Sequence, residues 1–299
     1  MKKLKDYIVE SIWDIEDNVR NDNNESILND IKKFIEDNYD YVDPKHLTFI
    51  FDKVKGKFVV NYAGDLKLNN DAESIVNGLF EWGIVKGHSI TTKGWFDCSE
   101  CPKLTTLEGA PKEVDGSFEC YKCPKLTSLE GAPEIVTGSF DCSRCLKLTS
   151  LKGAPEEVAG YFNCAECPEL ETLKWAPKTV NGHFNCSDCP KLETLKWAPK
   201  TVNGNFYCSN NPNLKTLEGV PENIGGLFNC NFCTELTTLK GAPKEVGGPF
   251  SCRGCTNLNS LKDTPKKIKG DFDCRECPNL HSLDGITRSV KGKIICGMS

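Results

Sequence analysis

A 22-residue repeat occupies the chain from about residue 90 to its end, and it constrains the fold more than any other feature of the sequence. Each unit follows the pattern P-x-x-V-x-G-x-F-x-C-S-x-C-P-x-L-x-x-L-x-G-A, of which residues 111 to 132 are a clean example. The pattern glycine recurs at Gly94, Gly116, Gly138, Gly160, Gly182, Gly204, Gly226, Gly248, Gly270 and Gly292. A phenylalanine, or Ile294 at the last pass, follows each glycine by two residues. Nine full units and a closing strand result, which predicts a solenoid of stacked turns.

The order of apolar residues within one unit predicts a short strand followed by turns. The phenylalanine and the first cysteine lie two residues apart, so they share one face of a strand. Two leucines three residues apart, such as Leu126 and Leu129, follow a proline and turn inward after the strand has ended. No unit can bury its apolar residues alone, whereas stacked units align like residues in one core. Strands about 4.8 Å apart would give one sheet roughly 43 Å long.

The repeat resembles the leucine-rich repeat over residues 92 to 296. Phe140 and Cys142 stand where the two strand leucines belong, and Cys145 stands at the Asn/Cys ladder position. Leu148 and Leu151 supply the later leucines. The units are most similar to the short bacterial type, and they also resemble cysteine-rich repeats of large bacteriophages and gut bacteria. The resemblance implies a solenoid with a parallel β-sheet on its concave face, over residues 91–299, and a phage origin.

Residues 1–90 differ from the repeats and are expected to form an α+β capping domain. Helical spacing of apolar residues indicates one helix over 3–20 and a second from 27 to about 39. The segments 47–51, 57–62 and 65–68 are typical of short strands. A cap covers the exposed end of a solenoid core. Residues 1 to 92 also hold 12 Lys and Arg against 17 Asp and Glu, and this surplus acidity would suit a partner contact instead.

The 18 cysteines have three possible roles, as core and ladder residues, as zinc ligands or as redox groups. The spacing C-x-x-C-x18-C-x-x-C falls within the range of four-cysteine zinc sites. However, Asn211 replaces the second cysteine in an otherwise intact unit, and asparagine suits a ladder whose side chains bond to backbone groups of the turns. A redox cysteine needs a helix start to lower its pKa. We therefore predict core and ladder cysteines, no metal and no cofactor.

Composition restricts the partners and the compartment. No stretch approaches the roughly 18 apolar residues of a membrane span, and acidic residues interrupt the segment after the basic start, so a cytoplasmic protein without membrane contact is expected. The chain beyond residue 92 is neutral and offers little attraction to phosphates, which disfavours nucleic acid as a partner. Four widely separated histidines without a nucleophile or carboxylate at a telling spacing argue against an enzyme.

The strand residues that alternate with the core are expected to line the concave face, which is usually the binding face of a solenoid. One column there is acidic and then rich in amides, and large side chains that often anchor interfaces flank it. A merely solvated face would also explain the charges. The predicted partner-binding residues are Trp95, Asp97, Glu119, Tyr121, Asp141, Tyr161, Asn163, His183, Asn185, Tyr207, Asn229 and Phe232.

The block ETLKWAPKTVNG occurs at 171–182 and again at 193–204. Trp175 and Trp197 replace the turn glycine of the pattern, and two indoles in adjacent units are expected to stack as part of a basic aromatic patch. A recent duplication in which tryptophan covers the turn is the alternative interpretation. The predicted second patch contains Lys174, Trp175, Lys178, Lys196, Trp197 and Lys200.

These features together predict a non-enzymatic solenoid that binds a protein. If the chain is encoded by a phage, as the resemblance implies, it would bind and block a host defence protein. A structural component of a virion or surface assembly, and a zinc-binding or redox CxxC repeat protein, are the alternative hypotheses.

Overall fold

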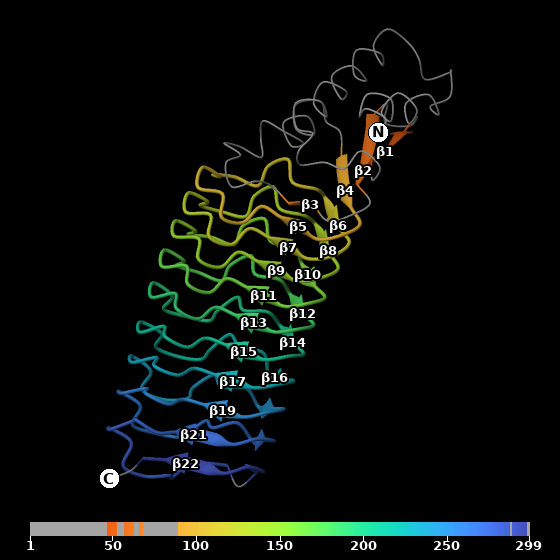
Figure 1. Cartoon of the computed structure of the whole chain (residues 1–299). Coiled ribbons are helices and arrows are strands. Elements are labelled where there is room, and N and C mark those ends of the chain that lie inside the picture. Colours follow the sequence, from red (N-terminus) through yellow and green to blue (C-terminus); the bar gives the residue numbers. More distant parts are fainter. Residues whose placement is uncertain (1–46, 53–56, 63–65, 68–88, 288, 298–299) are drawn as a thin grey trace.

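The computed structural model describes residues 47–52, 57–62, 66–67, 89–287 and 289–297 (Figure 1). Within these residues the chain winds as a parallel β-solenoid of about nine turns, and the turns stack into an elongated column. Each turn adds one strand to each of two sheets, because paired residues in adjacent turns are 22 positions apart, as in Phe162 and Phe184. The predicted 22-residue solenoid is confirmed.

The first sheet, named sheet A, is built on the valine of the repeat pattern. Its valines point inward and pair in register, as in Val158 with Val180 and Val136, while the residue before each valine faces outward. The first pair, β1–β2, is antiparallel, and the other pairs are parallel. The strands are β1 (Leu47–Asp52), β2 (Lys57–Tyr62), β4 (Ser89–Thr92), β6 (Glu113–Val114), β8 (Ile135–Val136), β10 (Glu157–Val158), β12 (Thr179–Val180), β14 (Thr201–Val202), β16 (Asn223–Ile224), β18 (Glu245–Val246) and β20 (Lys267–Ile268).

The second sheet, named sheet B, is built on the phenylalanine of the pattern. Backbone N–H groups of one turn donate to carbonyl groups of the next turn, as from Phe162 to His183 at 2.8 Å and from Cys164 to Asn185 at 2.9 Å. Its strands are β3 (Leu66–Lys67), β5 (Phe96–Asp97), β7 (Phe118–Glu119), β9 (Phe140–Asp141), β11 (Phe162–Asn163), β13 (Phe184–Asn185), β15 (Phe206–Tyr207), β17 (Phe228–Asn229), β19 (Phe250–Ser251), β21 (Phe272–Cys274) and β22 (Ile294–Cys296).

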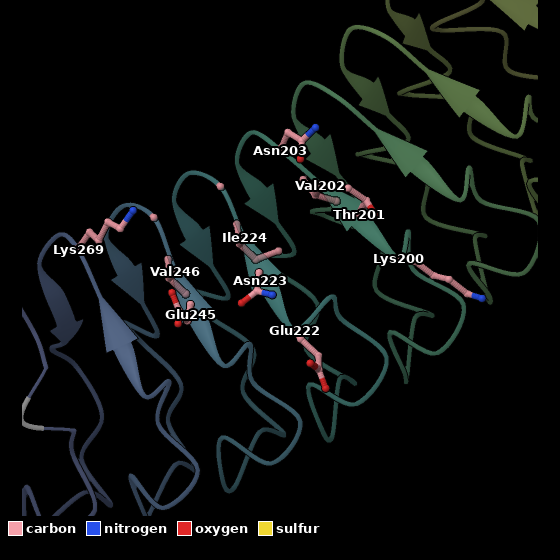
Figure 2. Close-up of a pocket in the computed structure, with 12 residues that line it drawn as sticks. Lys200, Thr201, Val202, Asn203, Glu222, Asn223, Ile224, Glu245, Val246 and Lys269 are labelled. Carbon is pink, nitrogen blue, oxygen red and sulfur yellow. The ribbon is translucent and has the colours of Figure 1, made fainter.

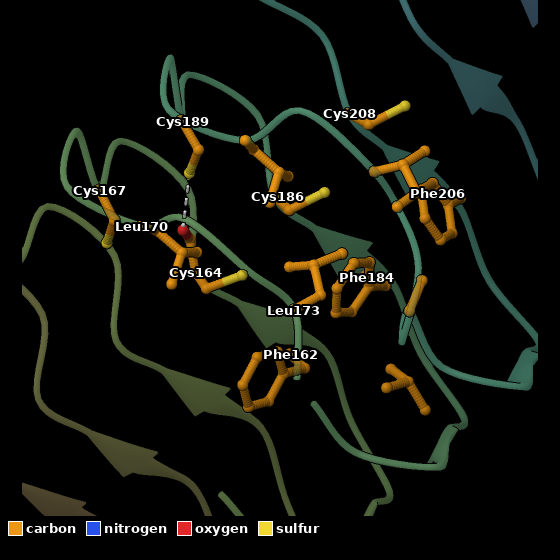
Figure 3. Packing of buried hydrophobic residues seen from close by; sticks show 14 of the residues in the cluster. Phe162, Cys164, Cys167, Leu170, Leu173, Phe184, Cys186, Cys189, Phe206 and Cys208 are labelled. Atoms are coloured by element: carbon orange, nitrogen blue, oxygen red, sulfur yellow. Dashed lines mark hydrogen bonds between the residues drawn. The ribbon is translucent and has the colours of Figure 1, made fainter. Parts of the chain in front are cut away.

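The core runs along the inside of the column as parallel rows of identical side chains (Figure 3). Phenylalanine rings of successive turns lie 5.1 to 5.9 Å apart between centroids, from Phe96 to Phe272. The cysteine pairs and the leucine pairs, such as Leu170 and Leu173, are buried beside them. No turn could bury these groups alone, so stability comes from contacts between turns.

The pattern glycines mark a corner where successive turns approach closely. A Cβ atom added at Gly116 would lie 2.6 Å from the carbonyl oxygen of Gly94 in the preceding turn. Real Cβ atoms do not approach backbone so closely, because the atoms would overlap. These glycines therefore let each turn pass close to the preceding one between sheet A and sheet B.

The structure corrects the expectation of a single sheet. The ten strands predicted from the phenylalanine column are present in sheet B, which gains β3 as an eleventh strand. The segment containing the valine, for which no strand was predicted, forms sheet A. The valine has no second apolar residue two positions away, in contrast to the Phe-x-Cys spacing of sheet B, so the sequence pattern did not indicate a strand there.

The strands expected before residue 90 are confirmed at 47–52, 57–62 and 66–67. They extend the sheets of the solenoid, because β2 pairs with β4 and β3 pairs with β5, both in parallel. The helices expected over 3–20 and 27–39 lie outside the described residues, and the domain boundary at residue 90 stays a prediction.

Candidate functional site

From Cys123 onward, the second cysteine of each CxxC pair binds the backbone of the preceding turn. The Sγ–H of Cys123 donates to the carbonyl of Cys98 at 3.3 Å, and that of Cys189 donates to the carbonyl of Cys164 at 3.4 Å (Figure 3). Asn211 does the same with more bonds, since its Nδ2 donates to two carbonyls at 3.0 Å and its Oδ1 accepts from the N–H of Cys189 at 2.8 Å. The predicted ladder is confirmed by these hydrogen bonds.

Burial keeps Cys98 and Cys189 as neutral thiols. It raises the pKa of Cys189 to about 12, and it raises the pKa of Cys98 well above its ordinary value. A thiolate is the form that attacks disulfides and binds metals, so these buried, protonated thiols are unreactive. In the part of the chain that the structure describes, no group of three or more His, Cys, Asp or Glu side chains is placed to hold a metal ion.

The Asp and Asn side chains on the outer face of sheet B accept hydrogen bonds from backbone groups of their own turns. The Oδ1 of Asp141 accepts a hydrogen bond from the N–H of Ser143 at 2.9 Å, and Asn185 binds the N–H of Ser187 at 3.0 Å. The same bond is made by Asp97, which is only 4% exposed, so this residue is not part of an accessible face as predicted. Members of this column that bind the N–H two residues ahead are Asp97, Asp141, Asn163, Asn185, Asn229 and Asp273.

The column before the phenylalanine also satisfies backbone groups. His183 accepts the N–H of Asn205 through Nδ1 at 2.8 Å, and Asn205 accepts the N–H of Leu227 through Oδ1 at 2.8 Å. Leu227 has no side-chain acceptor, and the next residue in the column is Pro249, which has no N–H to satisfy. The backbone N–H groups of Asn205 and Leu227 therefore each meet a side-chain acceptor from the preceding turn.

Four large side chains remain exposed or half-buried on this outer face, and we call them the tyrosine face: Tyr121, Tyr161, His183 and Tyr207. Tyr161 is 37% exposed, and its pKa is raised by partial burial and then by the charges of Asp141 and Glu119. Tyr207 accepts a hydrogen bond from Nδ2 of Asn205 at 2.7 Å and meets the ring of His183 edge-on at 6.3 Å. Neighbours thus hold Tyr207 in a fixed position.

Trp95, Glu119 and Phe232 complete the predicted set. Trp95 and Glu119 are half-buried on the outer side of sheet B. Phe232 lies on a turn after the strand, with φ 58°, and a Cβ atom at Gly254 of the next turn would be 2.3 Å from its ring. Phe232 therefore packs over this glycine and does not lie on the strand face where it was predicted.

The residues of the second predicted patch lie in different surroundings. Trp175 and Trp197 are exposed on adjacent turns, and the Nζ atoms of Lys174 and Lys196 each lie 5.0 Å from the centroid of the following indole. Among the described residues there is no ring contact between the two indoles, so the predicted stacking does not occur. Lys178 pairs with Glu156 at 2.7 Å. Lys200 lines a hollow on the outer face of sheet A.

This hollow has a volume of about 540 Å³ and was not predicted (Figure 2). Gly225 and Gly247 belong to its lining, at positions where adjacent turns carry Asn203 and Lys269. The double glycines at 225–226 and 247–248, which depart from the pattern, are the sequence signal that could have found it. Two lining carboxylates are neutralised, since Glu222 pairs with Lys244 and Glu245 with Lys267.

Comparison with known proteins finds no matching family, no matching curated protein and no matching solved structure. The fold defines the class of the protein, which is a parallel β-solenoid repeat protein with regularly spaced buried cysteines. None of the described segments forms a helix that could cross a bilayer.

Proposed function

We propose that this chain is a non-enzymatic solenoid that binds a protein partner through the tyrosine face. The observation that carries the proposal is the exposure of large rings on a rigid sheet whose polar neighbours are already bonded to backbone. Rigid aromatic side chains lose little freedom on binding and are frequent anchors of interfaces. His183 supports a binding role over a catalytic one, because its Nδ1 accepts a backbone hydrogen bond from the next turn.

The resemblance to leucine-rich repeats of large bacteriophages extends the proposal to a class of target. The ladder position, where Asn211 substitutes for cysteine, supports this resemblance. On this basis the bound protein is a bacterial host factor, and binding in the host cytoplasm blocks a defence function.

The repeat itself supplies substitutions that test the tyrosine face. Ser117 and Ser139 occupy the column of Tyr161, and Asn185 and Asn229 occupy that of Tyr207. A Tyr161→Ser/Tyr207→Asn variant therefore keeps residues that these columns already accept. Thr201→Glu on sheet A is the matched control, because three other turns carry glutamate there.

The measurement is affinity capture from bacterial host cells, with quantification of bound proteins by mass spectrometry. We expect the wild type and the Thr201→Glu control to retain the same protein and the double variant to lose at least about tenfold of it. Equal capture by all three chains would contradict the proposal.

A further inference from the structure

Trp175 and Trp197 are unusual residues for the backbone position that they occupy. At this position the chain has positive φ in all nine described turns, and six of the nine residues are glycines with φ between 86° and 109°. Trp175 and Trp197 have φ of 77° and 78°. A bulky side chain at positive φ is strained, and such strain persists mainly where the side chain has a use. Two consecutive turns keep this costly residue where glycine is the common choice.

The indoles do not cover the core. Trp175 is 51% exposed and Trp197 is 55% exposed. A tryptophan that served only to seal the turn would bury most of its ring, since burial is what large apolar side chains contribute to stability. These two rings instead present a large apolar surface outside the column.

The charge beside the indoles is not compensated as it is in two other turns. In the same column Lys152 pairs with Glu130 at 2.6 Å, and Lys240 pairs with Glu218 at 2.9 Å. Lys174 and Lys196 lie over the indoles, and the described residues place no carboxylate within 4.0 Å of them. Two adjacent cations beside two exposed rings form a surface whose complement is both acidic and apolar.

We propose that Lys174, Trp175, Lys196 and Trp197 form a docking site, the tryptophan patch, for an acidic protein segment that carries apolar or aromatic side chains. The carboxylates of the segment pair with the two lysines, and its apolar side chains pack on the indoles. This inference rests on the proposed function as a protein-binding solenoid, and it adds a second contact with defined chemistry.

Single-stranded nucleic acid also combines rings with negative charge. The chain beyond residue 92 is neutral, however, so it lacks the broad positive field that attracts a phosphate backbone. Tryptophan with a neighbouring cation is typical of small interface anchors in protein complexes. The observations therefore favour a peptide over a nucleic acid.

The test uses the full chain and a fluorescein-labelled random copolymer of glutamate and tyrosine as the probe. The variant is Trp175→Gly/Trp197→Gly, which restores the residue found at this turn in six other units. We expect the wild type to bind the copolymer and the glycine variant to bind at least about tenfold more weakly. Lys174→Gln/Lys196→Gln should also weaken binding and reduce its dependence on salt. Circular dichroism verifies that each variant is folded.

Two comparisons make the result decisive. The Tyr161→Ser/Tyr207→Asn variant, altered only on the tyrosine face, should bind the copolymer as the wild type does. Equal copolymer affinity of wild type and glycine variant, or tighter binding of an oligothymidine than of the copolymer, would overturn the inference. The proposed function would survive that outcome if the tyrosine variant still lost its captured protein. Capture that no substitution changes would instead count against the proposed function, whatever the copolymer shows.

Discussion

Replacing Phe162 by alanine tests the phenylalanine row at an interior position, where the ring is stacked on both sides. Phe162 is fully buried, and its ring lies between those of Phe140 and Phe184 at centroid distances of 5.3 and 5.9 Å. Truncation of a core phenylalanine costs about 3 to 5 kcal/mol, including the cavity left behind. The two stacking contacts are each worth about 0.5 to 1.5 kcal/mol beyond burial. The hydrogen-bonded turns hold the flanking rings apart, so the cavity cannot close. We therefore expect the free energy of unfolding to fall by an amount in the upper half of the range of about 3 to 5 kcal/mol.

Two further substitutions calibrate this result. Phe272 stacks on Phe250 alone, because Ile294 follows it and is largely exposed, so Phe272→Ala should cost about 1 kcal/mol less. Tyr161→Ser, one residue from Phe162 but on the outside, should change stability by no more than about 0.5 kcal/mol. Guanidinium unfolding followed by circular dichroism measures all three. A loss below about 1 kcal/mol for Phe162→Ala would refute the stacked core.

Two other predictions concern the cysteines. Cys123→Asn should shift the unfolding midpoint by only a few degrees, because Asn211 already makes the same backbone contact in another turn; a loss of the cooperative transition in a thermal melt would contradict this. Stability should also fall as pH rises above about 9, because burial raises the pKa of Cys189 from 9.0 to about 12, so the thiol is protonated in the folded chain and ionised in the unfolded chain between these values. Unfolding free energies measured from pH 7 to 10.5 would be flat up to about pH 8.5 and then decline; a flat curve throughout would refute the buried thiols.

The repeat pattern predicted the part of the fold that depends on identical neighbours. Columns of Phe, Cys and Leu recur at one spacing, and this alone places them in a stacked core. Asn211 identified the ladder because an amide and a thiol can both donate to a carbonyl. The second sheet escaped prediction, because a valine such as Val158 has no second apolar residue two positions away, whereas each phenylalanine has the cysteine.

The predicted surface was less accurate, because column position alone does not show what a side chain is bonded to. Asp97 and its equivalents were predicted to form an acidic and amide-rich binding face. In the structure, their side-chain oxygens accept hydrogen bonds from N–H groups of their own turns. The stacking predicted for Trp175 and Trp197 failed for a related reason, since each indole is held against its neighbouring lysine. Side-chain direction at a positive-φ turn does not follow from spacing.

The role of the cysteines as packing and ladder groups is tested most directly by the native mass of the purified protein. The account predicts the mass of the polypeptide with every cysteine as a free thiol and with no bound metal. A mass raised by zinc in steps of one ion for every two turns, or lowered by two hydrogens for each pair of cysteines, would contradict it.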